Sequence, residues 1–321
     1  MKEKMSKREG EGNSFSSFTK KYGIILVLIV LVVVAAIIQP RFLQPRNITN
    51  VLRQVAVNGV LAIGMTFVII SGGIDLSVGA NFCLSGLVMM SLMPYLTWPG
   101  AIVVGLLLGT VVGFLNGYMV FRGMPAFIMT LAMSIILKGC SYILSNGSPV
   151  PSTSTTYNFI GQGYLFGIPL PVYIYAAVAC FAAFIMVRTR FGRSVYSIGG
   201  NMEVARLSGI NIRRIRIAVF MISGFLSALA AIIGTARLGS ADPTLGEDYH
   251  SDAIAATVIG GTLMSGGEGH QFKTVVGVLI LGVLSNVLNL MGVNPNMQYV
   301  VKGAIIVAAV ASDVFSRNKK S

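Results

Sequence analysis

The chain has 321 residues, of which 54% are hydrophobic and only 11% are charged, and its formal net charge is +13. A soluble domain carries about 25% charged residues, so this composition excludes an ordinary water-facing protein and favours a polytopic membrane protein. Most Lys and Arg residues fall in loops on one side of the predicted spans, which is the positive-inside pattern and argues against a nucleic-acid partner.

The N-terminal part of the chain begins with a polar stretch, residues 1–22, which is predicted to be a cytoplasmic tail. The apolar run from Gly23 to Gln39 has no cleavage site and is long enough to span, so it is predicted to be a retained first helix rather than a signal peptide. The segment that follows carries Arg41, Arg46 and Arg53 on the predicted outer side, which conflicts with the positive-inside rule.

Further apolar runs predict an all-α fold of about ten transmembrane helices, because about 20 apolar residues cross a bilayer. The predicted organisation is a tail at 1–22, a transmembrane domain at 23–314 that includes a basic loop at 188–216, and a cytoplasmic tail at 315–321. The predicted spans are 23–39, 55–70, 78–93, one ending before Arg122, one ending near 143, 172–187, 217–236, 252–264, 274–291 and 298–314.

Two patterns concern how these spans pack. The fourth span resembles the ninth, since Val103–Leu108 matches Val275–Ile280 in a span of opposite orientation. Inverted repeats of this kind occur in transporters, and chance use of Val, Leu and Gly is the alternative. The fourth span also presents one bare helix face, which allows a neighbouring helix to approach closely. Four glycines form this stripe: Gly105, Gly109, Gly113 and Gly117.

No energy-converting motif is present in the sequence. Residues 267–274 approach a phosphate-binding loop, but Phe272 stands where the second glycine is required. Ion-driven transporters usually keep carboxylates within their spans, whereas every acid here is predicted in a tail, a loop or a helix end. We therefore expect a protein that is driven by a separate subunit. Lys138 and Lys302 are predicted inside spans, where they either snorkel to the interface or line a water-filled vestibule.

The basic loop at 188–216 contains one short amphipathic segment, Asn201–Gly209, bracketed by glycines. Gly199 and Gly200 are predicted to form a turn before the helix, and Gly209 to end it. Its apolar face would seat in a groove of a cytoplasmic partner, and it is predicted to consist of Met202, Val204, Ala205, Leu207 and Ile210. The alternative is a solvated basic loop that binds anionic lipid headgroups.

The sequence as a whole resembles the permease subunits of bacterial ABC importers for monosaccharides, and most closely the ribose permeases. The resemblance extends from about Gly23 to Asp313. It rests on motifs at Ser71–Gly79, Asn146–Val150, Gly199–Ile210 and Ser251–Gly261. One departure occurs within the third motif, where ribose permeases commonly have Asn-Glu-Ala-Ala and this chain has Asn201-Met-Glu-Val.

The resemblance implies a multi-pass permease of the bacterial inner membrane, with a type II-like importer fold. It implies two permease copies, a cytoplasmic ATPase that binds the ATP, and an extracytoplasmic sugar-binding protein. The permease itself is expected to hold no cofactor, and its glycine-bracketed segment is expected to be the coupling helix. The residues assigned to ATPase coupling are Gly199, Gly200, Asn201, Glu203, Ala205, Arg206, Leu207, Ser208 and Gly209.

Other candidate sites rest on the residues alone. Asn116, Asn286 and Asn289 are candidate polar groups of a translocation pathway, and hydrogen bonding to a neighbouring helix is the alternative. An outer acidic loop is a candidate contact for the binding protein, which it would meet through charge complementarity. Its acids are Asp242, Glu247 and Asp248. The competing functions are an ATP-independent secondary sugar transporter or facilitator, and a membrane scaffold without transport.

Overall fold

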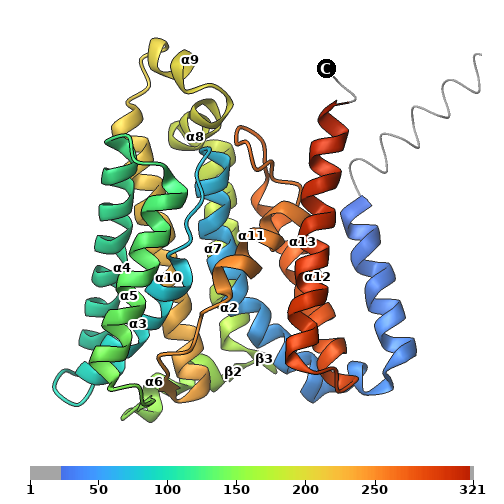
Figure 1. Ribbon diagram of the computed structural model, residues 1–321. Helices are drawn as coiled ribbons and strands as arrows, with labels where there is room; N and C mark the ends of the chain where they lie inside the picture. Colours follow the sequence, from blue (N-terminus) through green and yellow to red (C-terminus); the bar gives the residue numbers. More distant parts are fainter. Residues whose placement is uncertain (1–22, 319–321) are drawn as a thin grey trace, which may run out of the picture.

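The computed structural model describes residues 23–318 as a bundle of long, roughly parallel helices (Figure 1). The four strands are only two residues long, so the predicted all-α polytopic membrane fold is confirmed. The cytoplasmic tail predicted at 1–22 and the last residues of the tail predicted at 315–321 lie outside the described residues. The final helix continues to Asn318, beyond the predicted end of the last span.

The helices follow the apolar runs closely in most of the chain. A first helix occupies Gly23–Ile38. The other elements are η1 (Pro40–Leu43), α2 (Pro45–Ile70), α3 (Val78–Leu92), α4 (Trp98–Phe121), α5 (Ala126–Ser145), β1 (Val150–Pro151), α6 (Thr155–Gln162), β2 (Tyr164–Leu165), β3 (Ile168–Pro169), α7 (Leu170–Arg188), α8 (Arg190–Gly200), α9 (Met202–Leu207), α10 (Ile212–Leu238), β4 (Ser240–Ala241), α11 (Tyr249–Ile259), α12 (Gln271–Leu290) and α13 (Pro295–Asn318).

The predicted count of ten helical spans is not confirmed. Within residues 23–318, six helices are long and apolar enough to cross a membrane, namely α2, α4, α5, α7, α10 and α12. The spans predicted at 78–93 and 252–264 correspond to the shorter helices α3 and α11, which have 15 and 11 residues. At 1.5 Å per residue these helices are too short for a hydrocarbon core of about 30 Å.

Each short helix completes its crossing together with an extended segment. After α2 reaches one end of the bundle, residues 71–77 return toward the middle, where α3 begins (Figure 1). After α10 reaches the opposite end, residues 239–248 return toward the middle, where α11 begins (Figure 1). Gly72 and Gly239 allow the two reversals, since their φ angles are 80° and 70°. We call residues 71–77 and 239–248 the two re-entrant segments.

The glycine stripe of α4 packs as predicted. A Cβ on Gly113 would lie 2.2 Å from the Phe220 carbonyl oxygen of α10, and one on Gly117 would lie 2.8 Å from the Ile217 Cα. Gly109 abuts α10 as well, with Ala228 Cβ at 2.7 Å. The backbones of α4 and α10 are therefore in direct contact, which permits close helix packing without a large side-chain interface.

The end of the bundle opposite the C-terminus carries the short elements. Helix α6 and the two small antiparallel pairs, β1 with β4 and β2 with β3, cover this end (Figure 1). Tyr157 of α6 is fully buried and its hydroxyl lies 2.6 Å from that of Thr235. The arginine-containing segment also lies at this end, where the Arg53 guanidinium stacks 4.6 Å from the Tyr164 ring centroid. The basic loop at 188–216 lies at the opposite end, so the positive-inside rule makes this the outer end of the bundle. The Arg53 guanidinium is therefore on the outer side, where the Tyr164 ring is its cation–π partner.

Candidate functional site

The predicted coupling segment folds as the end of α8 followed by the separate helix α9. Asn201 is the N-cap of α9, where its side-chain oxygen accepts the Val204 N–H at 3.1 Å. Gly209 follows the helix with a φ of 80°, in agreement with the predicted glycine stop. The predicted turn at Gly199 and Gly200 was wrong, because both residues lie in the last turn of α8. The chain changes direction at Asn201, which is the C-cap of α8 and the N-cap of α9.

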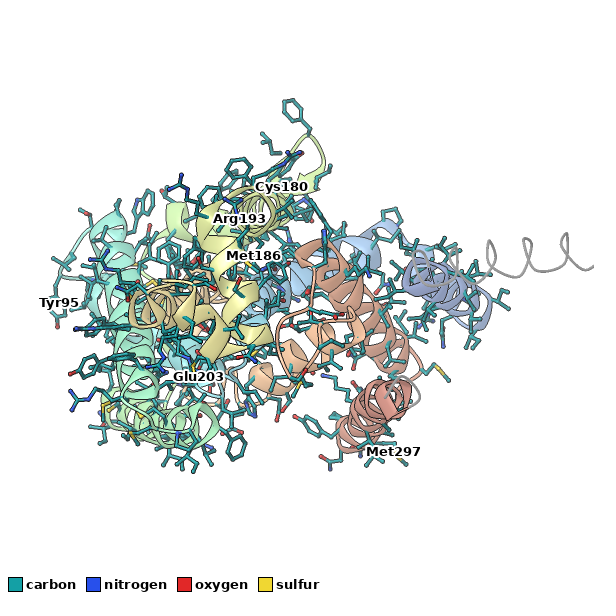
Figure 2. All side chains as sticks on the ribbon, turned by 90° about the horizontal axis from the view of Figure 1, so that it is seen from above. Tyr95, Cys180, Met186, Arg193, Glu203 and Met297 are labelled. Carbon is teal, nitrogen blue, oxygen red and sulfur yellow. The ribbon has the colours of Figure 1, made fainter. Side chains whose placement is uncertain are left out.

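Helix α9 is the outermost element of the inner end of the bundle, and Glu203 lies on this surface when the molecule is seen from that end (Figures 1 and 2). Its Glu203 carboxylate pairs with Arg206 at 2.9 Å, and Ser208 closes the helix by donating to a backbone carbonyl. Ala205 is buried, so this part of the predicted docking face points into the protein instead. Three apolar side chains of α9 are exposed at 41, 57 and 82% respectively: Met202, Val204 and Leu207.

Beneath α9 lies a contact made almost entirely of backbone, which we call the glycine junction: Ile70, Gly72, Gly199, Gly266 and Gly267. The Gly267 N–H donates to the Ile70 carbonyl at 2.9 Å, at the end of α2. A Cβ on Gly199 would lie 1.8 Å from that same oxygen, and one on Gly266 would lie 2.9 Å from the Gly72 Cα. Helix α8, the end of α2 and the loop before α12 therefore meet with no side chain between them.

Inside the bundle, the first re-entrant segment carries a carboxylate that the sequence did not predict to be buried. Asp75 is 1% exposed, although every acid was expected in a tail, loop or helix end. Its Oδ1 accepts the backbone N–H and the hydroxyl of Ser77 at 3.0 and 2.6 Å, and its Oδ2 accepts the hydroxyl of Ser223 at 2.8 Å. The Asn116 amide donates to the Ser77 hydroxyl at 2.8 Å, and its own oxygen has no hydrogen-bond partner among residues 23–318. This network ties α3, α4 and α10 together.

The second re-entrant segment repeats the local structure of the first. Asp242 Oδ1 accepts the N–H and the hydroxyl of Thr244 at 2.8 and 2.6 Å, as Asp75 Oδ1 does from Ser77. Residues 75–79 and 242–246 both read Asp-x-Ser/Thr-x-Gly, and each motif is preceded by a glycine of positive φ that follows a long helix, Gly72 or Gly239. Two separate parts of the chain therefore build the same turn before a short helix.

The two turns meet at their glycines. A Cβ on Gly79 would lie 2.0 Å from the Gly246 carbonyl oxygen, and a Cβ on Gly246 would lie 2.7 Å from that of Gly79. Next to them, the rings of Phe82 and Tyr249 are arranged edge to face with centroids 5.0 Å apart. This contact, which we call the glycine crossing, brings the beginnings of α3 and α11 together in the membrane interior.

On the outer side of the glycine crossing lies an open cavity of about 600 Å³, lined by residues of α2, α3, α10, α11, α13 and the end of the second re-entrant segment. This size falls within the range of about 300–1,000 Å³ typical of small-molecule sites. Most of its lining is polar or aromatic. The side chains in question are Gln54, Asn58, Phe82, Arg237, Thr244, Glu247, Asp248, Tyr249, Asp252, Tyr299 and Lys302.

Both lysines predicted inside spans are paired at this level. Lys302 of α13 contacts the two carboxylate oxygens of Asp252 at 3.0 Å each, and both side chains are at least 80% buried. Lys138 of α5 pairs with Glu247, whose side chain is about half exposed. Lys302 lines the cavity, so the vestibule interpretation fits this lysine better than snorkelling, whereas Lys138 is half exposed and does not line the cavity.

The three acids predicted to contact a binding protein lie along the second re-entrant segment. Asp242 makes the turn described above, while Glu247 and Asp248 reach the cavity. Their contact with a binding protein stays a prediction.

The other predicted pathway asparagines connect helices. Asn286 of α12 and Asn47 of α2 exchange two amide hydrogen bonds, at 2.8 and 2.9 Å. The Asn289 oxygen accepts from Gln298 of α13 at 2.8 Å. Both contacts match the alternative stated for them, hydrogen bonding to a neighbouring helix.

Three cavity residues were not singled out from the sequence. Gln54 and Asn58 stand one helical turn apart on α2, and a pair of amides at i, i+4 in an apolar run is the signal that would have identified them. Arg237 lies just beyond the predicted end of its span at 236. Neither amide nor the Arg237 guanidinium has an ion pair or a side-chain hydrogen bond within residues 23–318.

Comparison with known proteins agrees with a membrane permease. Residues 47–310 match the family described as the permease component of branched-chain amino acid transport systems. A ribose import permease protein of Bacillus subtilis is 44% identical, with 98% of each chain covered. A D-allose transport system permease protein of Escherichia coli is 38% identical over 94% of this chain and 93% of its own length.

A xylose transport system permease protein of Escherichia coli is 36% identical, with 87% of each chain covered. No solved structure matches this chain. The family match covers most of the described residues, including nearly all of α2, both re-entrant segments, the coupling segment and α12. This chain therefore belongs to that family of membrane-spanning transport permeases.

Proposed function

We propose that this protein is the membrane-spanning subunit of an ATP-driven importer of ribose or a closely related monosaccharide. The observation that carries the proposal is the similarity, over nearly the whole chain, to permeases named for ribose, allose and xylose. The family description names branched-chain amino acids instead, whose aliphatic side chains require an apolar pocket. The largely polar outer cavity suits a polyol better.

The power source would be a separate cytoplasmic ATPase that docks on α9. The exposed Met202, Val204 and Leu207 side chains offer an apolar contact at the tip of the inner surface, as helix-in-groove recognition requires. The glycine junction below α9 joins it to the end of α2 and to the loop before α12. Because this contact is backbone against backbone, a displacement of α9 would not be absorbed by side-chain rearrangement.

The two re-entrant segments support an internal inverted repeat, with α2–α5 related to α10–α13. Helix α2 ends at the inner glycine junction, whereas α10 ends at the outer surface, where Gly239 accepts from the Ser152 N–H. Each is followed by a glycine of positive φ, the Asp-x-Ser/Thr-x-Gly turn and a short helix. In transporters with inverted repeats, the transport pathway lies between the two halves, which here is the region of the glycine crossing.

We further infer about ten membrane crossings in a type II-like importer fold, if each short helix is counted with its re-entrant segment. A second permease copy would complete the pathway at the dimer axis, and an extracytoplasmic binding protein would deliver the sugar to the outer end. Glu247 and Asp248, near the outer cavity, are available for contact with its rim. The surrounding lipid is the remaining partner, and ATP would be bound only by the partner ATPase.

One observation favours the competing secondary transporter, namely the buried carboxylate of Asp75. Intramembrane acids often relay protons. Here, however, three hydrogen bonds from Ser77 and Ser223 give Asp75 a structural task at the start of α3. A role as the turn-forming residue accounts for its position without a proton relay.

Uptake of labelled ribose distinguishes the two functions. In the source bacterium, loss of this chain should abolish ATP-dependent, binding-protein-dependent ribose uptake. Sealed vesicles that contain this chain alone should accumulate no ribose, with or without a proton gradient. Accumulation by the chain alone, abolished by Asp75→Asn, would establish the secondary transporter and refute the importer.

A further inference from the structure

We propose that the outer cavity is itself a low-affinity binding site for a neutral monosaccharide. It would hold the sugar after delivery and before it passes the glycine crossing. The inference rests on the proposed function, because it assigns a place within the permease to the substrate of that importer.

The cavity provides hydrogen-bonding groups that the protein itself does not use. The Gln54 and Asn58 side chains project from successive turns of α2 and line the cavity. Each amide offers two donors and one acceptor oxygen, and neither is engaged with another described side chain. A sugar hydroxyl both donates and accepts, so adjacent hydroxyls match a pair of amides at this spacing. The Arg237 guanidinium adds further donors on the facing helix α10.

The charges around the cavity are balanced, which favours a neutral ligand. Asp252 is neutralised by Lys302 through two contacts of 3.0 Å, and Glu247 by Lys138. Arg237 and Asp248 are the remaining charged groups of opposite sign in the lining. A sugar phosphate or a carboxylic acid would meet no excess of positive charge here, whereas an uncharged polyol needs none.

Aromatic rings supply the apolar part of the surface. Phe82 and Tyr249 stand edge to face at the inner end of the cavity, and Tyr299 lines it from α13. Tyrosine combines a flat apolar ring with a polar hydroxyl, and a pyranose or furanose ring likewise has apolar C–H groups between its hydroxyls. The lining therefore fits the mixed surface of a sugar better than an aliphatic side chain.

The cavity is closed on its inner side in this structure. The Gly79 and Gly246 backbones are in contact there, and Phe82 packs against Gly234 of α10, where an added Cβ would lie 2.6 Å from the ring. A sugar released on the outer side would stop at this point until α3 and α11 separate. A residence site is therefore expected on the outer side of the glycine crossing.

Binding is tested with the complete chain in lipid nanodiscs, using D-ribose as the probe and saturation-transfer difference NMR as the readout. Wild type should bind with a dissociation constant of about 1 mM or weaker, as suits a site from which the sugar must leave. Asn58→Leu and Gln54→Leu should each weaken binding by about tenfold, because each removes hydrogen bonds made to the sugar. Thr110→Val is the matched control, since that hydroxyl donates only within its own helix, to Leu106.

The competing ligands define the ligand class. D-xylose and D-allose should displace ribose, whereas ribose 5-phosphate and L-leucine should not. Displacement by leucine, or equal binding by wild type and both amide variants, would overturn the proposal. Two variants are used so that poor folding of one, detected as loss of a monodisperse peak, leaves the other informative.

Uptake by the complete importer separates this inference from the proposed function. With Asn58→Leu, ribose uptake should fall at least fivefold while binding-protein-stimulated ATP hydrolysis persists. If the importer moves ribose with ATP and neither amide variant changes uptake or binding, the cavity site is refuted and the importer function stands. If the wild-type complex moves no monosaccharide, the proposed function fails and the site with it.

Discussion

Replacement of Gly199 by alanine tests whether the glycine junction transmits force from α9. The new Cβ would lie 1.8 Å from the Ile70 carbonyl oxygen and 2.5 Å from the Gly267 nitrogen, so it would enter the hydrogen bond that joins those two groups. Overpacking of this kind costs about 1–3 kcal/mol, and the lost hydrogen bond about 0.5–1.5 kcal/mol. The better helix propensity of alanine offsets about 1 kcal/mol.

The net perturbation of about 0.5–3.5 kcal/mol is comparable to the coupling free energy between two sites, which is typically about 1–3 kcal/mol or roughly 5–150-fold. In the reconstituted importer, we expect Gly199→Ala to retain the bound ATPase and its ATP hydrolysis. The number of ribose molecules imported per ATP hydrolysed should fall at least fivefold. Labelled-sugar uptake and phosphate release, measured on the same proteoliposomes, give this ratio directly.

Gly200 provides a control one residue away. A Cβ on Gly200 would meet no atom within 4 Å, and its backbone is helical, so Gly200→Ala should leave the ratio unchanged. Equal ratios in wild type and in both variants would refute the reasoning. An equal loss in both variants would also refute it, since α8 propensity rather than the junction would then control coupling.

Two further predictions concern stability. Lys302→Met leaves the largely buried Asp252 without its cation, so the free energy of unfolding should fall by about 3 kcal/mol. The double variant Lys302→Met with Asp252→Leu should recover most of this loss. Thermal unfolding in detergent measures both variants, and a double variant no more stable than the single one would contradict the prediction. Burial, followed by the positive charge of Lys273, lowers the pKa of His270, whose Nδ1 accepts the Phe272 N–H at 3.3 Å at the start of α12. Between the folded pKa and the ordinary value of about 6.5, the unfolded chain binds more protons than the folded protein. The free energy of unfolding should therefore be constant above about pH 6.5 and decline as pH falls through the folded pKa. His270→Asn caps without titrating and should flatten that decline, whereas an unchanged slope would assign it to other groups.

The membrane class and most helix positions could be predicted because they depend on local composition. The runs that form α7, α10 and α12 are long, apolar and bounded by polar residues, so bilayer thickness predicts where they lie, although α10 begins at Ile212, inside the basic loop and before the predicted start of its span. The α4 stripe was equally readable, since four glycines at one helical spacing permit only close packing. The same reasoning failed at α3 and α11. Their apolar residues satisfy the composition of a span, whereas Gly72 and Gly239, with positive φ, redirect the chain before either helix begins.

The candidate site was predicted only where it is local in sequence. Asn201 and Gly209 mark the ends of α9 through capping rules that need no tertiary information. Gln54, Arg237 and Lys302 come from three different helices, and no pattern within one segment indicates that they share a cavity. The burial of Asp75 was likewise hidden, because a loop residue is normally solvated and only the re-entrant path places it inside.

In the importer proposed above, the re-entrant geometry would let one short segment connect the docking helix α9 with the outer cavity. At its beginning, the segment 71–77 contributes Gly72 to the glycine junction under α9. At its end it leads into α3, where Gly79 forms the glycine crossing. A full-length helix in this place would carry its motion through many side-chain contacts along its whole length. Here the path is a few residues of backbone, held at its centre by the hydrogen bonds of Asp75. In the proposed importer, displacement of α9 would therefore reach the inner wall of the cavity through this short segment, while the glycine contacts of α4 keep it packed against α10.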